Sequence, residues 1–484
     1  MPDSPLLTAR SGDASLLEIK ALLEGRPEPK ALDLALQKLQ DAALPPDALR
    51  NPLELLFSCL TRCFPEYAGQ IARMHIPLSR RKYEYVALLQ TALDNFATTY
   101  EWLIDNTEDL ASRDRAVFAE RVAFSLSKHL YISHLASAPP RHGIWRRLHR
   151  AGFIRDADGN MPVFYREALL LAAINPASFS AHDLILAAGL LSEAAETLKI
   201  LFTPPEPSGE ENSVFWIDPE RDFSLFAVKR REPPPSGRVF YFLGAPIAEK
   251  LREECARMES ANHSADGRRS KKRVLRRLAV ELGSPGKRRF ARRRHSGISR
   301  AHACFGMEPL WALLSSDCAG EERSEWMVVN ESPDGYALML LNGKAHSLRA
   351  GEVVALRLEK EEGWLICMVR WVSSENPEHL EIGLQIVALN AVPALFTEAA
   401  DTLAEKMAAV DEHGETQRLG NIPLVFLPQH PPLREHPSLL APSGALSGQT
   451  ANALVLNING SERVIQLLNP CEQSSRVDIF AVAA

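Results

Sequence analysis

The first two hundred residues carry apolar side chains at the three-to-four spacing of amphipathic helices. Segments of this kind, rich in Ala and Leu, cover residues 14–24, 31–43, 79–105, 110–135 and 179–201. Helix-breaking pairs separate them at Pro45-Pro46, Pro139-Pro140 and Asn175-Pro176. No fixed repeat period is found, so the pattern predicts an all-α bundle or array over residues 1–205 rather than a solenoid.

The pattern changes in residues 206–286. Residues 213–219 and 237–244 have the aromatic and β-branched composition of strands and flank a Pro-rich loop. Residues 245–260 and 270–283 are expected to form helices. The second is amphipathic, ends at a Gly and has its apolar residues on one side: Val274, Leu275, Leu278 and Leu282. We expect a small β/α connecting unit whose last helix docks on a neighbouring domain.

Residues 287–392 contain several segments with the sequence pattern of β-strands. The segment WMVVNESPDGYALML at 326–340 is an apolar strand, a turn and another apolar strand, because Asn, Ser, Pro, Asp and Gly favour tight turns. Three further β-rich runs follow between residues 353 and 387. Residues 306–325 lie before the turn and are expected to form a short helix and a polar loop.

The remaining segment, residues 393–484, is predicted to begin with an Ala-rich helix at 393–410. Strand-like patterns return near the C-terminus, where Asn459-Gly460 is a strong hairpin signal. We therefore expect a helix followed by a small C-terminal β unit, a second barrel or sheet. The whole chain is predicted to be an α+β multidomain protein.

Composition limits the class of protein. The chain has 484 residues, of which 46% are hydrophobic and 24% charged, as in soluble globular proteins of about three domains. No run of about twenty uncharged apolar residues occurs, and the N-terminus lacks the basic-then-apolar order of a secretory signal. The seven cysteines are scattered, which favours a reducing compartment. We expect a cytoplasmic protein that does not insert into a membrane.

One segment is strongly basic although the net charge of the chain is -6. Between Arg268 and Arg294 there are thirteen Lys or Arg residues and a single acid, Glu281. Such a run indicates an anionic ligand, an anionic partner or a solvated linker. The run fits a nucleic-acid partner less well than a small anionic ligand, because no nucleic-acid motif accompanies it and Phe290 is its only aromatic residue for base stacking.

Two motifs carry the candidate chemistry. The first is a pair of arginines one helical turn apart, present in two frames that the sequence does not separate: Arg288 with Arg292, and Arg289 with Arg293. The arginine fork suits phosphate oxygens and the O6/N7 edge of guanine. The second motif is the Asn-x-Ser-x-x-Gly of the predicted turn: Asn330, Ser332 and Gly335. Its polar side chains can bond to a base edge, and its Gly permits a positive φ or close ligand approach.

Both motifs in this order, followed by strands that end in Gly-Leu-Gln-Ile at 383–386, resemble the PilZ family, whose members bind cyclic di-GMP. The resemblance covers roughly residues 287–390. It implies an antiparallel β-barrel with cyclic di-GMP on its outside, held by the seven residues of the two motifs. Residues 142–152 and 167–184 resemble helical N-terminal regions of some bacterial PilZ-containing proteins. The resemblance implies a signalling receptor that couples ligand binding to a protein partner through its helical domain.

No catalytic or metal site is expected. His182-Asp183 lacks companion ligands and fits a helix cap, while Cys59 and Cys63 fit a helical core. His129 and His134 do not share a helical face. With no phosphate loop or nucleophile motif present, we predict a non-enzymatic protein without cofactor or metal.

Two alternatives remain open. The first is a PilZ-like scaffold that has lost its ligand, which is supported by the insertion at 306–325 and the polar residues 295–297. The second is a nucleic-acid-binding protein that uses segment 268–294.

Overall fold

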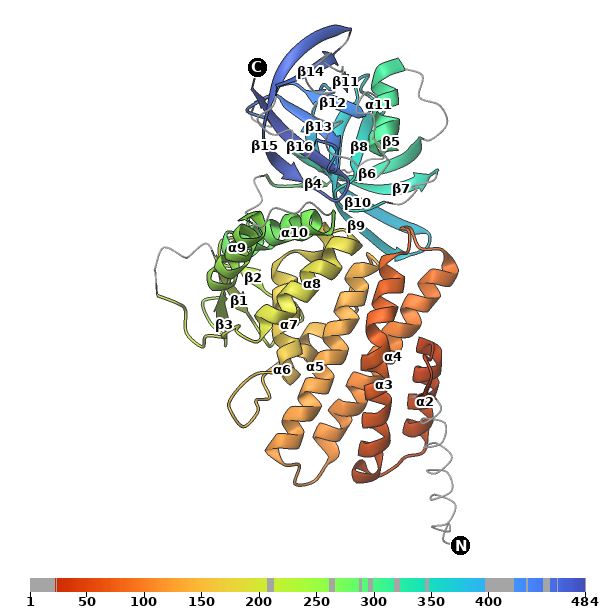
Figure 1. Cartoon of the computed structure of the whole chain (residues 1–484). Helices are drawn as coiled ribbons and strands as arrows, with labels where there is room; N and C mark the ends of the chain where they lie inside the picture. Colours follow the sequence, from red (N-terminus) through yellow and green to blue (C-terminus); the bar gives the residue numbers. More distant parts are fainter. Residues whose placement is uncertain are drawn as a thin grey trace, which may run out of the picture.

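Figure 1 shows an elongated helical domain with two β units at one of its ends. The computed structural model describes residues 22, 24–206, 213–260, 266–286, 290–294, 299–316, 323–343, 348–396, 422–431, 434–446, 453–458 and 460–483. Some predictions fall outside these residues: most of segment 14–24, Arg288 and Arg289, residues 295–297, residues 397–410 and Asn459.

The helical domain confirms the predicted helices and their breaks at the proline pairs. Its helices are α2 (Pro29–Asp41), α3 (Pro46–Ala72), α4 (Arg80–Asn106), α5 (Ser112–Leu135), α6 (Ile144–Gly152), α7 (Val163–Ala173), η1 (Pro176–Ser178) and α8 (Ala181–Ala195). Helix α3 contains Cys59 and Cys63, which were expected on a helix, and it continues through Pro52 and Pro65 although proline disfavours helix interiors. The helix predicted to reach residue 201 ends at Ala195, and Leu201 pairs instead with Tyr241.

The connecting unit has the predicted strands and helices. Strands β1 (Val214–Ile217), β2 (Phe226–Ala227) and β3 (Phe240–Leu243) form a sheet of order β2-β1-β3, followed by α9 (Ala245–Ser260) and α10 (Asp266–Gly283). Helix α10 packs on α9 and on α8. The four apolar residues predicted on one side of α10 are all buried, so its amphipathic pattern is confirmed.

The first β unit is a closed ring of antiparallel strands. Its strands are β5 (Arg300–Phe305), β6 (Ser324–Ser332), β7 (Gly335–Asn342), β8 (Val353–Leu358), β9 (Leu365–Asn376) and β10 (His379–Ala388). Pairing runs β6-β5-β8-β9-β10-β7, and the β6–β7 hairpin closes the ring. The short strand β4 (Arg293–Arg294) adds to the outer end of β6. We call this ring the first barrel.

The second β unit is also a closed barrel, here called the second barrel. Its strands are β11 (Val392–Phe396), β12 (Pro423–Leu427), β13 (Ser438–Pro442), β14 (Ala453–Ile458), β15 (Ser461–Gln473) and β16 (Val477–Ala483). The predicted β14–β15 hairpin is confirmed, with Ile458 opposite Ser461. The helix predicted from residue 393 is wrong at its start, because residues 392–396 alternate: Ala394 and Phe396 point into the barrel core while Leu395 is 38% exposed.

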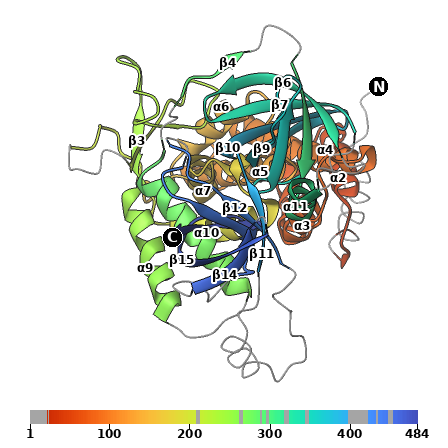
Figure 2. The ribbon, with the colours of Figure 1, turned by 90° about the horizontal axis from the view of Figure 1, so that it is seen from above.

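An apolar interface joins the two barrels, which lie side by side above the helices (Figure 2). One buried cluster combines Val353 and Ile366 of the first barrel with Val425 and Ile479 of the second. Helix α11 (Met307–Ser316) adds side chains to the same cluster and packs on β11 and β12. The insertion at 306–325 thus contains the predicted short helix, which lies between the barrels rather than between the two sequence motifs.

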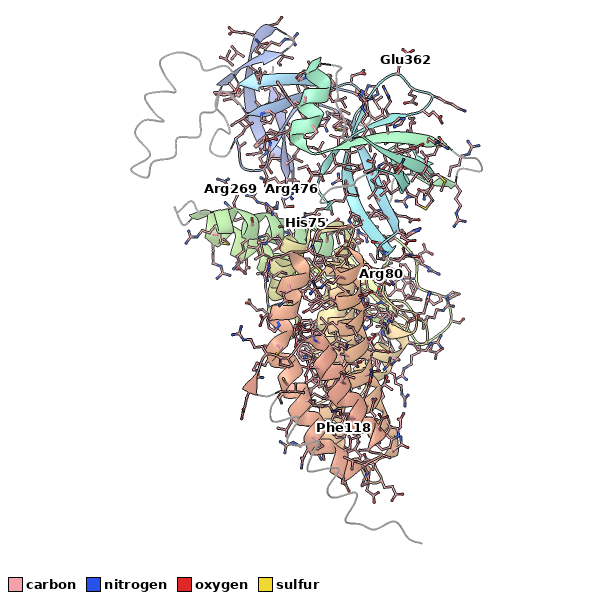
Figure 3. The ribbon with its side chains drawn as sticks, turned by 90° about the vertical axis from the view of Figure 1, so that its right-hand side faces the viewer. His75, Arg80, Phe118, Arg269, Glu362 and Arg476 are labelled. Carbon is pink, nitrogen blue, oxygen red and sulfur yellow. The ribbon has the colours of Figure 1, made fainter. Side chains whose placement is uncertain are left out.

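Polar contacts connect the helical domain to the barrels. Helix α10 bonds to the helical domain through Arg273 and to the second barrel through Arg276, whose Nη1 donates to Gln473 Oε1 at 3.3 Å. Figure 3 shows Arg269 and Arg476 near this junction, and His75 at the barrel-facing end of the helical domain. No helix in the described ranges combines the length and apolarity needed to cross a membrane.

Candidate nucleotide-binding site

The Asn-x-Ser-x-x-Gly motif forms the β6–β7 hairpin. Ser332 ends β6 and is paired with Gly335, the first residue of β7. The Ser332 hydroxyl donates to Asp334 Oδ1 at 2.7 Å. The amide of Ile386 donates to the carbonyl oxygen of Asp334 at 2.8 Å, which ties the turn to β10. The turn is therefore held by a hydrogen bond within it and by a second hydrogen bond from strand β10.

The arginine motif lies beside this hairpin. In the β4–β6 pairing, Arg294 is opposite Asn330 and Arg293 is opposite Glu331. Arg292 immediately precedes β4 and lines the same cavity as Ser332. The structure thus brings together the described parts of two motifs that are distant in sequence.

The cavity has a volume of about 390 Å³ on the outside of the first barrel. It is lined by Arg292, Ser332, Asp334, Gly335, Tyr336, Arg370, Trp371, Gly383, Leu384 and Gln385. Arg293 and Asn330 are not among the lining residues. Volumes of this size are usual for small-ligand sites, which combine an apolar wall with a few polar groups.

Strands β9 and β10 supply site residues that the sequence motifs do not include. Arg370 Nε donates to Gln385 Oε1 at 2.6 Å, so the two side chains are linked within the cavity wall. Trp371 lies over Gly383, where a Cβ atom would come within 1.9 Å of the indole Nε1. The available sequence signal was a charged residue followed by Trp inside an otherwise apolar strand, WLICMVRWV.

The need for glycine at position 335 has a different structural cause from those predicted. Its φ is not positive. A Cβ atom at this position would lie 2.0 Å from the carbonyl oxygen of Leu384, so Gly335 is required for the close approach of β7 to β10. Of the two reasons predicted for this Gly, the positive φ is absent and the close approach of a ligand stays a prediction; the close approach that the structure has is that of strand β10.

Asn330 has an unusual environment. Its side-chain oxygen is buried and has no hydrogen-bond partner among the described residues. The β6–β7 register shifts between Val328 and Asn330, a bulge of the type that often lies next to functional sites. Leaving a buried polar atom unpaired costs roughly 1–3 kcal/mol, so Asn330 Oδ1 is poised to accept a bond from an added donor.

The cavity combines positive charge with neutral polar groups. The lining includes two arginines, Arg292 and Arg370, and one carboxylate, Asp334. Burial raises the pKa of Tyr336 to about 12, so its phenol is neutral at physiological pH. Arg370 also contacts Glu472 of the second barrel, with its Nη2 donating to Oε2 at 3.1 Å. The site can bind an anion and offer donors to a base edge.

The residues considered as metal or catalytic candidates in the sequence have structural roles. Cys59 and Cys63 are buried in the helical core, as predicted. Within the part of the chain that the structure describes, no group of three or more His, Cys, Asp or Glu side chains could hold a metal ion. The predicted helix-capping role of His182-Asp183 is corrected: Ser180 caps α8 by accepting from the Asp183 amide, and the Asp183 carboxylate binds Arg273.

Comparison with protein families gives two matches. Residues 28–206 match the N-terminal domain of the cyclic-di-GMP receptor FimW, and residues 316–393 match its middle PilZ domain. Together the two matches cover more than half of the chain. The chain belongs to this family. No curated protein matches it.

Membership of the FimW family confirms the PilZ resemblance and the helical N-terminal region. The first match covers α2 to α8, and the second covers the strands β6 to β10 that carry the turn motif and the cavity wall. The arginine motif and most of the second barrel lie outside both matches.

Proposed function

We propose that this chain is a receptor that binds cyclic di-GMP in the cavity beside the β6–β7 hairpin. The observation that carries the proposal is the β4–β6 pairing, because it sets the arginine segment against the Asn-x-Ser-x-x-Gly hairpin. The proposed ligand-binding residues are Arg288, Arg289, Arg292, Arg293, Asn330, Ser332 and Gly335. Their role is to bind a ligand, and no catalytic step is proposed.

The structure favours one of the two arginine frames. Arg292 lines the cavity together with Ser332, whereas its neighbour Arg293 does not. Neighbouring side chains in an extended segment point to opposite faces, so one arginine of the pair faces the ligand and the other faces away. We therefore assign the main contacts to Arg288 and Arg292, with Arg289 and Arg293 contributing chiefly to the local positive charge.

The ligand chemistry fits these groups. Cyclic di-GMP carries two phosphates and two guanines, and each guanine presents the O6/N7 acceptor pair that an arginine fork binds. Adenine replaces O6 with a donor amine, which repels the same fork. The site should therefore discriminate guanine from adenine in a cyclic dinucleotide.

We further propose that binding is transmitted to the helical domain through the β9–β10 hairpin. Strand β9 contains Arg370 and Trp371 of the cavity and reaches the helical domain, where the Ser374 amide donates to the Ser137 carbonyl at 2.8 Å (Figure 1). A ligand shifts the arrangement of domains only if it binds one arrangement more tightly. In the favoured arrangement the helical domain presents a surface to a protein partner.

Two structural observations weigh against the alternatives. Helix α11 of the insertion lies at the barrel interface and leaves the two motifs adjacent, which removes one argument for a scaffold without ligand. Several arginines of the basic segment are engaged within the molecule: Arg273 pairs with Asp183, and Arg277 donates to Ser178. They are less available for the phosphates of a nucleic acid.

Isothermal titration with four ligands tests the proposal: cyclic di-GMP, cyclic di-AMP, GMP and a generic DNA duplex, each at low and high salt. We expect binding of cyclic di-GMP in clear preference to the other two nucleotides, with a mild salt dependence. A nucleic-acid-binding protein would lose duplex affinity steeply with salt, because many counterions are released. Salt-sensitive duplex binding without preference for cyclic di-GMP would replace the receptor proposal, and no binding of any ligand would favour the scaffold.

A further inference from the structure

Arg370 belongs to two parts of the molecule. It lines the candidate cavity on the first barrel, and its guanidinium forms a two-pronged ion pair with Glu472 of the second barrel. The pair links residues that are 102 positions apart. Its third nitrogen, Nε, donates to Gln385. All three nitrogens of the guanidinium therefore have partners within the protein.

We infer that Arg370 is an additional ligand-binding arginine, and that the anionic ligand of the cavity competes with Glu472 for its guanidinium. This inference rests on the proposed function and extends it to a residue outside the two motifs. Nη1 and Nη2 of Arg370 both bond to Glu472 and Nε bonds to Gln385, so a phosphate reaches two-pronged geometry at the Nη edge only by displacing the carboxylate. Recruitment of Arg370 to the ligand must therefore release Glu472.

The surroundings of the ion pair favour such an exchange. Arg370 and Glu472 are only about one-third exposed, with side-chain exposures of 35% and 30%. Arg277 of α10 lines a neighbouring cleft of about 970 Å³ together with both residues. Burial lowers the pKa of Arg277; the carboxylates of Glu281, Asp183 and Glu472 raise it, and the positive charge of Arg370 lowers it. A phosphate that replaces the Glu472 carboxylate would supply negative charge to Arg370 in its place.

Release of Glu472 would remove only one of the polar contacts between the barrels. A second ion pair, between Glu352 and Arg476 at 3.5 Å, connects the barrels away from the cavity. The Ser474 hydroxyl also donates to the Gly351 carbonyl at 2.7 Å. These contacts do not compete with the ligand, so the exchange changes the contact at Arg370 specifically.

A double-mutant cycle on the full chain tests the competition. The variants are Glu472→Gln, Arg370→Gln and the double variant, each titrated with cyclic di-GMP by calorimetry. We expect Glu472→Gln to bind roughly two- to fivefold more tightly, the factor that corresponds to losing a partly exposed ion pair. Arg370→Gln should bind roughly tenfold more weakly, because a charge-assisted bond to phosphate is lost. In the Arg370→Gln background, the Glu472→Gln change should have no effect on affinity.

Glu352→Gln is the matched control. It also removes a carboxylate from an ion pair between the barrels, but that pair does not touch the cavity. We expect the affinity of this variant to equal that of the parent chain. An equal gain in both carboxylate variants would overturn the inference, because general loosening of the barrels would then explain the effect.

Two other results would also overturn it: unchanged or weaker binding by Glu472→Gln, or a gain that persists without Arg370. Circular dichroism and thermal unfolding check that each variant is folded. If Arg370→Gln does not fold, Arg370→Lys replaces it in the cycle, since it keeps the charge but loses the fork. A parent chain that does not bind cyclic di-GMP would reject the proposed function and this inference together. Binding by the parent with no coupling in the cycle would reject the inference alone.

Discussion

At the scale of single residues, two adjacent arginines have different surroundings. Arg292 lines the candidate cavity, whereas Arg293 is paired through its backbone with Glu331 and is not part of the cavity wall. Both side chains are exposed and carry the same charge. Variants of the two arginines can therefore distinguish direct contact with the ligand from the general attraction of a positively charged surface.

We predict that Arg292→Ala weakens cyclic di-GMP binding by about tenfold or more, because a charge-assisted hydrogen bond is worth roughly 1.5–3 kcal/mol. Arg293→Ala serves as the control and should change the affinity by less than about threefold, since the long-range electrostatic loss is shared by both variants. Calorimetric titration at one fixed salt concentration measures both. Equal losses in the two variants would mean that the arginines act only through net charge.

Gly335 gives a second prediction at this scale. Gly335→Ala should destabilise the fold by about 1–3 kcal/mol or more, because its Cβ would lie 2.0 Å from a backbone carbonyl that cannot move independently. Gly363→Ala is the control, since nothing lies within 4 Å of a Cβ there. Denaturant midpoints compare the two variants. A Gly335→Ala protein as stable as the parent would contradict the packing explanation.

At the scale of elements, α10 connects the helical domain to the second barrel. Its Arg273 donates to Asp183 of α8 at 2.5 Å, and both side chains are largely buried, with exposures of 11% and 6%. The Arg277 guanidinium lies 3.7 Å from the ring centroid of Phe179 and donates to Ser178. Charged side chains of this helix thus hold it to the end of the helical domain that faces the barrels.

We predict that Asp183→Ala destabilises the protein by roughly 3–5 kcal/mol, because it leaves a buried guanidinium without its carboxylate. Hydrogen exchange should increase in α10 more than in α4. Replacing both partners by apolar residues, with Asp183→Leu and Arg273→Met, should restore most of the stability, since the buried charge is then absent. A double variant as unstable as the single one would show that the pair is not the cause.

The sequence predicted what is local and periodic. The helices, the NESPDG hairpin and the buried face of α10 follow from spacing within one segment. The strand at 392–396 was missed because Ala and Leu near residue 393 fit a helix, while its two strand partners, β12 and β14, lie more than 25 residues further along the chain. Arg370 and Glu472 were missed for the same reason, because no motif links residues 102 positions apart.

At the scale of the whole molecule, the two barrels share one apolar interface. The residues that form it from the first barrel lie on strands β5, β8, β9 and β10, and those from the second lie on β12, β13 and β16. The interior of the second barrel is a buried cluster of its own, whereas the interior of the first barrel belongs to the same cluster as the core of the helical domain. The ion pairs of Glu352 and Glu472 add polar contacts to this apolar interface, so we expect the barrels to stay joined when one pair is lost.

This shared interface has a practical consequence for shortened versions of the protein. A chain that ended after the first barrel would expose the outward apolar side chains of β8 and β9, among them Val353, Ile366 and Met368. Exposed apolar patches of this kind promote aggregation. We therefore expect the isolated PilZ unit of this chain to aggregate. Ligand-binding measurements should consequently use the full chain.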